Sequence, residues 1–190
     1  MSGHDEATME DLRAQAFEII RTRSFMRGEV RLASGRMSDH YFDMKPSMLD
    51  PVGAGVLARM LFARIAPAQV DHVGGLEMGA VPLLGPLAMV SAQANQPLPA
   101  FFVRKTVKAH GTQRLIEGVR DLAGKRVAIV EDVTTTGGSA MASIKAVQAE
   151  GAEVALVISL LDREQGAAAL YREAGLAFDW LFQASAFLNT

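Results

Sequence analysis

The sequence predicts an α/β fold in which a mostly parallel, twisted sheet is covered by helices on both faces. Apolar runs that suit strands alternate along the chain with segments that suit helices, and those runs are apolar through most of their length. Such strands need cover on both faces, as in the parallel sheets of α/β proteins. With 190 residues and no recognisable linker, the chain is expected to form a single domain over 1–190.

The first half of the chain is expected to contribute three helices, a hairpin and two strands. Apolar residues at amphipathic spacing indicate the helices, Pro51 can begin one of them, and a turn at Ser34-Gly35-Arg36 separates two brief strand-like pieces. The expected order is a helix over 9–22, a hairpin or flap within 28–44, a helix over 51–65, a strand over 70–76, a helix over 79–94 and a strand over 98–105.

In the second half, residues 106–124 show no sustained period and are expected to be mostly loop. Two short apolar runs and a helical stripe that stops at Gly151 come after this loop. The expected order is a strand over 125–132, a helix over 138–151, a strand over 153–162, a helix over 165–175, a strand over 177–183 and a terminal turn.

The composition argues against several classes of protein. Nineteen basic against twenty-one acidic side chains give a net charge of −2, so no overall positive field favours nucleic acid. The absence of Cys excludes disulfides and thiolate chemistry and suits a reducing compartment, for which the cytoplasm is the default. The acidic amino terminus lacks the apolar core of a secretory signal, and the most apolar segment carries Glu77 and two Pro, which argues against a membrane span. His4, His40 and His72 lack the spacing of metal ligands, so no protein-bound zinc is expected.

The stretch that carries the most chemistry is VAIVEDVTTTGGS, residues 127–139. An apolar strand ends in Glu131 and Asp132, and a loop rich in hydroxyls and glycine then leads into a helix. Glycines let backbone N–H groups approach a phosphate at a helix N-terminus, and Thr and Ser hydroxyls add donors. Adjacent carboxylates accept hydrogen bonds from a vicinal diol and favour positive charge that develops on a sugar ring. Together these features predict a site for a phosphoribosyl group.

Other phosphate-binding motifs do not fit this stretch. A Walker A loop ends in Gly-Lys-Ser/Thr, whereas Gly138-Ser139 lacks the Lys, and no G-x-G-x-x-G fingerprint follows the first strand. The remaining alternative is a strand-to-helix turn that binds nothing, in which the acids serve as helix caps.

The whole stretch resembles the phosphoribosyl pyrophosphate motif of the type I phosphoribosyltransferases. The resemblance implies that family's fold, with a small N-terminal hood formed by about residues 1–45. It also implies that the donor brings Mg²⁺ on its pyrophosphate, so a dedicated metal cage in the protein is not expected. In the family the two acids hold the ribose hydroxyls and the loop binds the 5′-phosphate. The donor-binding residues carried over from this motif are Glu131, Asp132, Val133, Thr134, Thr135, Thr136, Gly137, Gly138 and Ser139.

A second cluster places Arg104, Lys105, Lys108 and His110 in one loop-like segment. Taken alone, such a run is most simply a solvated group of surface charges. It nevertheless resembles, at every position, the catalytic loop of the orotate phosphoribosyltransferase family, which reads Arg-Lys, two residues, Lys, one residue, His-Gly. The resemblance implies that these four residues bind the donor's pyrophosphate and that Lys108 and His110 act with Asp132 in catalysis. It also implies a homodimer in which each loop closes over the partner's active site.

Two further segments resemble the same family and imply contacts with the acceptor. LASGRMSDHYFD would place Tyr41 and Phe42 along a flat pyrimidine, and LLDREQG would place Arg163 against the carboxylate of orotate as a planar fork of donors. Thr135 of the loop is also assigned to orotate by this resemblance. The alternatives are that the two aromatic residues belong to the core and that Arg163 caps a helix or pairs with Asp162.

The chain departs from the family pattern at two places. Many members carry Lys where this chain has Ala33, and Tyr-Lys-Gly where it has Glu77-Met78-Gly79. Two expected cations are therefore absent, and the backbone of Gly74-Gly75 is an alternative source of donors for the pyrophosphate.

The activity implied by the resemblance is the transfer of ribose 5-phosphate from phosphoribosyl pyrophosphate to orotate, which yields orotidine 5′-monophosphate and pyrophosphate in pyrimidine biosynthesis. Two alternatives remain at this stage. A purine phosphoribosyltransferase, or a non-catalytic regulator that senses the donor, would share the motif at 127–139, but neither requires the cationic loop.

Overall fold

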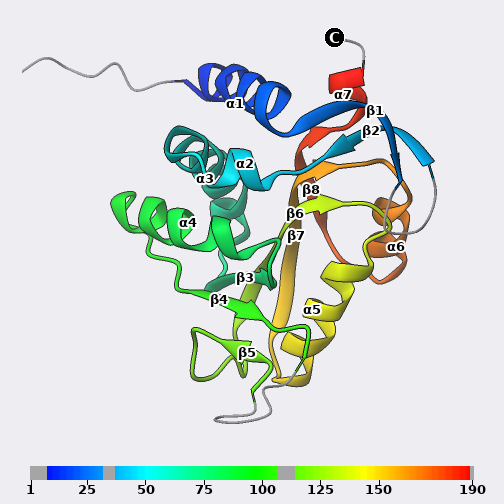
Figure 1. Ribbon diagram of the computed structural model, residues 1–190. Helices are drawn as coiled ribbons and strands as arrows, with labels where there is room; N and C mark the ends of the chain where they lie inside the picture. The colour runs from blue at the N-terminus through cyan, green and yellow to red at the C-terminus, as the bar shows by residue number, and fades with distance from the viewer. Residues whose placement is uncertain (1–7, 32–36, 107–113, 189–190) are drawn as a thin grey trace, which may run out of the picture.

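The computed structural model describes residues 8–31, 37–106 and 114–188, and it places a six-stranded sheet between two layers of helices (Figure 1). The predicted α/β class with a mostly parallel sheet is confirmed. The strand order is β5-β4-β3-β6-β7-β8, and every neighbouring pair is parallel except β4 and β5. The strands are β3 (His72–Leu76), β4 (Ala100–Val103), β5 (Ile116–Glu117), β6 (Arg126–Thr134), β7 (Glu153–Asp162) and β8 (Phe178–Gln183).

The helices occupy the two faces of the sheet that Figure 1 shows on its left and right. On one side lie α1 (Met9–Arg23), α2 (Lys45–Met48), α3 (Pro51–Ile65), the short turn η1 (Ala66–Ala68) and α4 (Val81–Gln93); on the other lie α5 (Gly138–Ala149) and α6 (Ala167–Glu173), and α7 (Ser185–Leu188) ends the described chain. The caps follow from the sequence, since Thr8 forms a capping box with Asp11 and Asp50 accepts the first free N–H groups of α3. Among the described residues, no helix combines the length and the apolarity needed to cross a membrane.

Strand alternation along β6 explains why its apolar run is continuous. Ala128 and Val130 belong to the core under α1, α3 and α4, whereas Val127 and Ile129 belong to the second core under α5 and α6. Because successive side chains of a strand point to opposite faces, a sheet covered on both sides needs apolar residues at every position.

The prediction that residues 106–124 are mostly loop is confirmed for the described residues 106 and 114–124, with one short strand as the exception. Ile116 and Glu117 form the short edge strand β5, which pairs antiparallel with β4. Ile116 is buried in the same core as Phe101 and Leu122. A strand of two residues is too short to produce a readable period, which is why the sequence did not reveal it.

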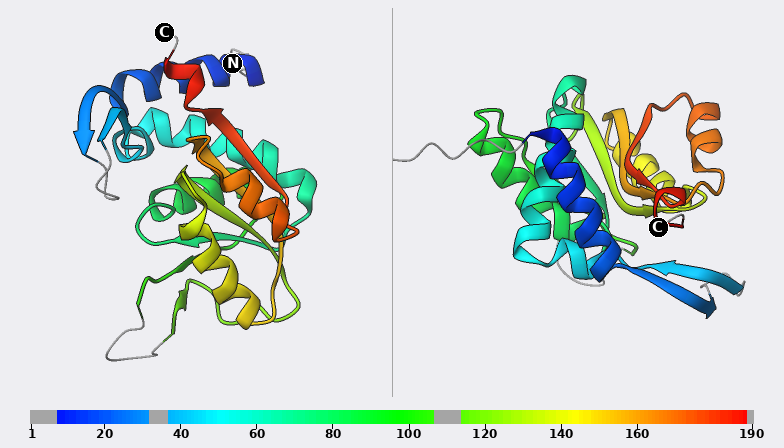
Figure 2. Two further views of the ribbon diagram at one scale, coloured as in Figure 1. Left: turned by 90° about the vertical axis from the view of Figure 1, so that its right-hand side faces the viewer. Right: turned by 90° about the horizontal axis from the view of Figure 1, so that it is seen from above.

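The predicted flap is an antiparallel pair, β1 (Phe25–Arg31) and β2 (Met37–Phe42), that projects from the body of the molecule (Figure 2). An aromatic cluster anchors its base: Phe42 stacks on Phe25 with ring centroids 4.9 Å apart, and Phe187 of α7 packs against both rings. Phe17 of α1 stacks on Phe187 at 4.4 Å. The cluster therefore joins the flap, the first helix and the end of the chain.

Replacing Phe187 with Ala should lower the free energy of unfolding by about 3–5 kcal/mol, because its fully buried ring contacts four other rings of this cluster. Urea unfolding followed by circular dichroism would measure the change. Leu188→Ala is the matched control, since this neighbour is 39% exposed and should change stability by less than about 1 kcal/mol. Equal effects of the two substitutions would contradict the role assigned to the cluster.

Candidate active site

A pocket opens where the connection of the strands reverses direction. From β3 the chain proceeds to β4 on one side, but the next parallel strand, β6, lies on the other side of β3. In open α/β sheets, ligands bind at such a switch point beyond the carboxyl ends of the strands. The pocket at this point has a volume of about 250 Å³ and is lined by Lys45, Leu76, Glu77, Met78, Gly79, Lys105, Glu131, Asp132 and Ser139.

The end of β6 carries both acids of the motif into this pocket. Its ladder with β3 stops at Ile129, whereas its ladder with β7 continues to Thr134. The strand ends two residues later than predicted, at Thr134, and Glu131 and Asp132 lie beyond the last pairing with β3. Because β3 no longer pairs with β6 beyond Ile129, the pocket forms between the end of β6 and the turn after β3.

Burial raises the pKa of both acids. Glu131 is only 6% exposed, and burial, with a smaller contribution from the neighbouring Asp132 carboxylate, raises its pKa to about 8. Burial also raises the pKa of Asp132, against opposing effects of a backbone hydrogen bond at Val133 and the positive charge of Lys45. Both carboxylates therefore favour a ligand that offers hydroxyl donors or positive charge.

The turn after β3 is shaped around Asp132. A Cβ on Gly79 would lie 2.5 Å from Oδ1 of Asp132, so any larger residue would displace the carboxylate. The turn leads directly into α4, with the N–H of Ala80 donating to the carbonyl of Leu76 at 3.1 Å. This close approach explains the Gly of the Glu77-Met78-Gly79 segment.

The hydroxyl-rich loop lies between β6 and α5. Thr135, Thr136 and Gly137 form the turn, and Gly138 and Ser139 begin the helix. Gly137 has a φ of +86°, and a Cβ there would also crowd Tyr171, whose hydroxyl donates to the Gly137 carbonyl at 3.3 Å. The first N–H groups of α5 thus lie beside the acids, as a phosphate cradle requires.

The cations of the second cluster are described only in part. Lys105 lines the pocket, and its N–H donates to Oε1 of Glu77 at 2.9 Å, while Arg104 lies 3.9 Å from Oε2 of the same carboxylate. Glu77 thereby ties the end of β4 to the turn after β3. Lys108 and His110 lie outside the described residues, as does Ala33.

Of the residues predicted to contact the acceptor, Arg163 and Tyr41 lie at the flap, whereas Phe42 lies in the core. Arg163 follows β7, and its guanidinium reaches the flap, where Nη2 lies 3.1 Å from Nε2 of His40. Tyr41 is half-buried on β2. Phe42 is 4% exposed and packs in the aromatic cluster, which agrees with the alternative that it is a core residue.

Gly74 and Gly75 serve packing rather than the pocket. Both are buried inside β3, where a Cβ on Gly74 would overlap the ring of Phe101 and one on Gly75 would overlap the carbonyl of Val130. Neither glycine is among the residues that line the pocket, and the expectation that their backbone offers donors to the pyrophosphate stays a prediction.

Sequence reasoning missed Lys45 and the pairing role of Glu77. Lys45 begins α2 and its Nζ lies 3.1 Å from Asp43, on the side of the pocket facing Asp132. Nothing in the surrounding sequence marks it. Glu77 could have been found, because it directly follows a parallel strand and the carboxyl ends of such strands are where ligands bind.

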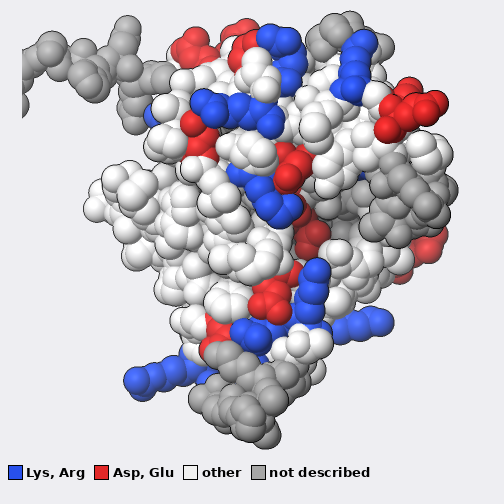
Figure 3. All heavy atoms as spheres, viewed as in Figure 1, with Lys and Arg blue, Asp and Glu red and all other residues white. Residues whose placement is uncertain are grey.

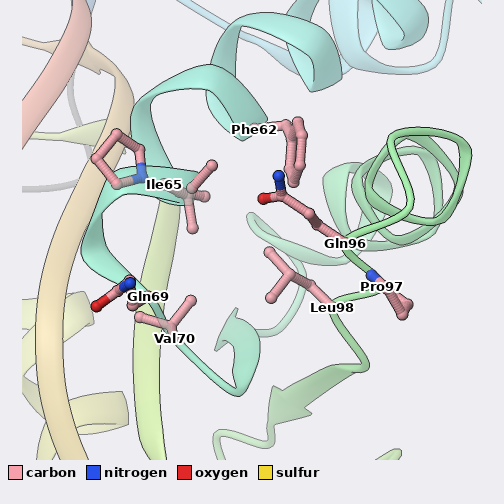
Figure 4. A pocket seen from close by; sticks show the side chains of 9 residues that line it. Phe62, Ile65, Gln69, Val70, Gln96, Pro97 and Leu98 are labelled. Atoms are coloured by element: carbon pink, nitrogen blue, oxygen red, sulfur yellow. The ribbon is translucent and has the colours of Figure 1, made fainter.

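A larger pocket, of about 550 Å³, lies away from this chemistry (Figure 4). Phe62 and Ile65 near the end of α3 face Gln96 and Leu98 of the segment that leads into β4. It borders the amino ends of β3 and β4, which is the opposite edge of the sheet from the acids.

Replacing Glu131 with Gln should stabilise the empty protein, and more strongly as pH rises. The folded chain keeps the Glu131 proton up to about pH 8, whereas the unfolded chain releases it near 4.5. Because the unfolded state then binds fewer protons, this residue lowers the free energy of unfolding across that interval. The expected gain is small near pH 5 and on the order of 1 kcal/mol or more near pH 8.

Urea unfolding at the two pH values would measure this gain, with the exposed Glu173→Gln as the control. A gain of the same size at both pH values would contradict the buried, proton-holding state of Glu131.

Known proteins are similar to this chain in sequence and in fold. A family model described as the phosphoribosyl transferase domain matches residues 52–175. An orotate phosphoribosyltransferase of Rhodopseudomonas palustris is 55% identical over 181 residues, which cover 94% of this chain and 97% of the relative.

Among solved structures, the orotate phosphoribosyltransferase of Mycobacterium tuberculosis in complex with Fe(III) dicitrate superposes with a TM-score of 0.82 at 37% identity, covering 93% of this chain and 98% of the other. The same enzyme in complex with 5-phospho-alpha-D-ribosyl 1-diphosphate gives a TM-score of 0.78 at 33% identity, with the same coverage. The chain belongs to the phosphoribosyltransferase family and, within it, to the orotate phosphoribosyltransferases.

Proposed function

We propose that the pocket at the end of β6 transfers ribose 5-phosphate from phosphoribosyl pyrophosphate to a ring nitrogen of orotate, releasing pyrophosphate and orotidine 5′-monophosphate. The observation that carries this proposal is the meeting of the buried Glu131, the half-buried Asp132, a glycine turn and a helix N-terminus in one pocket at the switch point of the sheet. A diol and a phosphate on one sugar satisfy the acids and the helix together.

In this proposal the donor's ribose lies across the end of β6. Glu131 and Asp132 accept hydrogen bonds from the 2′ and 3′ hydroxyls, and the loop over 135–139 with the start of α5 binds the 5′-phosphate. As the bond from the anomeric carbon to pyrophosphate breaks, positive charge develops on the sugar ring, and the Asp132 carboxylate stabilises it. Orotate then attacks that carbon from the opposite face, with inversion.

The departing pyrophosphate needs positive charge. Lys105 lines the pocket, and the Arg104 guanidinium lies 3.9 Å from the carboxylate of Glu77, which also lines it. We assign Lys108 and His110 of the same loop to stabilising or protonating the leaving group, by resemblance to the family.

The acceptor is assigned to the side of the site under the flap. Arg163, a planar fork of donors, suits the orotate carboxylate, and Thr135 adds a hydroxyl. Two aromatic residues were predicted to contact the pyrimidine. We assign this contact to the half-buried Tyr41, because Phe42 is packed in the core.

Magnesium fits this pocket as a companion of the donor. Two carboxylates with raised pKa face the pocket, and a cation there would favour their ionised forms. In this proposal the ion is held mainly by the pyrophosphate oxygens of the donor. When bound, Mg²⁺ supplies charge neutralisation to the leaving group. The cytoplasmic location and the single domain over 1–190 stay predictions.

The activity test mixes the protein with Mg²⁺, phosphoribosyl pyrophosphate and, in turn, orotate, adenine, hypoxanthine or uracil, and follows nucleotide formation by chromatography. We expect turnover of orotate alone, and we expect Asp132→Asn to lower its kcat/KM by roughly 100-fold. Glu173→Gln is the control. Turnover of a purine base instead of orotate would replace the proposal with the purine enzyme, and turnover of no base would favour a donor-sensing regulator.

We also propose that the chain acts as a homodimer with shared sites. No charged residue occurs over 78–103, yet this segment includes the outward side of α4, where Met89 is 53% exposed. Met78, in the turn beside the pocket, is 60% exposed. Figure 3 shows the corresponding uncharged area on the left of the molecule. An uncharged face of this kind suits burial against a second copy.

Shared sites predict complementation between two inactive chains. A Lys108→Ala chain mixed with an Asp132→Ala chain should recover about a quarter of wild-type activity, because half of the dimers are then mixed and one of their two sites is intact. Subunit exchange is verified first by native mass spectrometry. If mixed dimers form and activity stays at the level of the separate variants, the loop acts within its own chain.

A further inference from the structure

We propose that His40 of the flap, held by Asp39, is a positioning residue that aims the Arg163 guanidinium at the carboxylate of the acceptor. This inference rests on the proposed function, since it concerns how one site residue is held in place. Arg163 and His40 are 123 positions apart in the chain, and their contact connects the flap to the carboxyl end of β7.

Arg163 is held from the sheet and from the flap. Its N–H donates to the carbonyl of Thr134 at 2.8 Å, which fixes the backbone at the end of β6. Its guanidinium nitrogen Nη2 lies 3.1 Å from Nε2 of His40 and 3.4 Å from Oγ of Ser38. The residue is 8% exposed, and a buried guanidinium requires such acceptors.

Donor and acceptor roles in this network have a single solution. A guanidinium offers donors only, so Ser38 and His40 must both accept from Nη2. The Ser38 hydroxyl accordingly sends its own proton to the carbonyl of His40, at 2.7 Å. Nε2 of His40 can accept only if Nδ1 carries the ring proton, and Nδ1 lies 2.7 Å from Oδ1 of Asp39.

Asp39 therefore selects the tautomer that His40 needs. Its side chain is 92% exposed, so its role rests on this hydrogen bond and not on packing. The hydrogen bond with His40 is the largest cause of the lowered pKa of Asp39, which keeps the carboxylate available as the acceptor. The ring itself makes an edge contact with Phe42, at 5.8 Å between centroids.

The consequence is a fixed plane for the guanidinium. The contacts with Ser38 and His40 are both made by Nη2 of Arg163, so they set the orientation of the guanidinium plane. The hydrogen bond from the Arg163 N–H to Thr134 holds the backbone of Arg163 in place. Recognition of a carboxylate by Arg depends on the orientation of this plane. His40 thus acts on the acceptor through Arg163.

The test compares three substitutions at one position. His40→Ala removes the acceptor and should raise KM for orotate roughly tenfold, the loss expected for one hydrogen bond to a charged group. The KM for phosphoribosyl pyrophosphate and kcat should change less than about twofold. His40→Gln, whose side-chain oxygen can reach the place of Nε2, should restore most of the orotate KM, whereas His40→Asn, whose shorter side chain matches Nδ1 instead, should not.

A double-substitution cycle separates positioning from a general effect on the fold. In an Arg163→Ala background, His40→Ala should add no further rise in the orotate KM, because the group it acts through is gone. Additive effects, or an equal rise in both KM values, would show that His40 supports the flap as a whole and would overturn the inference. Glu29→Gln, on the neighbouring strand β1, is the matched flap control.

Failure of this inference is distinguishable from failure of the proposed function. Turnover of orotate by the wild type with an unchanged orotate KM in His40→Ala overturns the inference and leaves the function standing. If the wild type uses a base that lacks a carboxylate, the inference falls together with the proposed function, because Arg163 then has no carboxylate to bind. If the wild type uses no base, both proposals fall.

Discussion

The withdrawal from water of two adjacent carboxylates at the end of β6, one buried and one half-buried, is the constraint on which the rest of the site depends. Ionised groups are costly to remove from water, and the raised pKa values of Glu131 and Asp132 express that cost. The neighbouring elements adapt to the pair. The turn after β3 carries Gly79 where a side chain would collide with Asp132, and Lys45 approaches from the flap side.

The sheet topology explains why the acids can be there at all. If β6 were paired with a neighbouring strand on both sides along its whole length, a ligand could not lie beside Glu131 and Asp132. Here the pairing of β3 with β6 ends at Ile129. Beyond this point the two strands separate, and they lead into α4 and α5. The apolar part of β6 stabilises the fold through both cores, and only its last residues are exposed to the pocket. Stability and function are thus divided along a single strand.

Much of this was predictable from sequence because it is local. The alternation of strands and helices, the acids at the end of β6 and the glycine turn before α5 all lie in contiguous segments with their own periods and turn residues. The features that could not be predicted depend on contacts between distant segments. Ile116 joins a sheet edge without a readable pattern, and Phe42 packs against Phe187 from the other end of the chain.

The charge balance of the pocket differs from what a count of its residues indicates. Its lining contains three acids and two lysines, which would oppose a polyanionic donor. Glu77, however, is engaged by the end of β4, and the pKa of about 8 leaves Glu131 largely protonated near neutral pH. The empty pocket therefore carries less negative charge than its composition suggests, so a phosphorylated sugar meets less repulsion as it enters. Once its hydroxyls and an accompanying cation reach Glu131, they favour the ionised carboxylate, and binding of the donor is coupled to the loss of that proton.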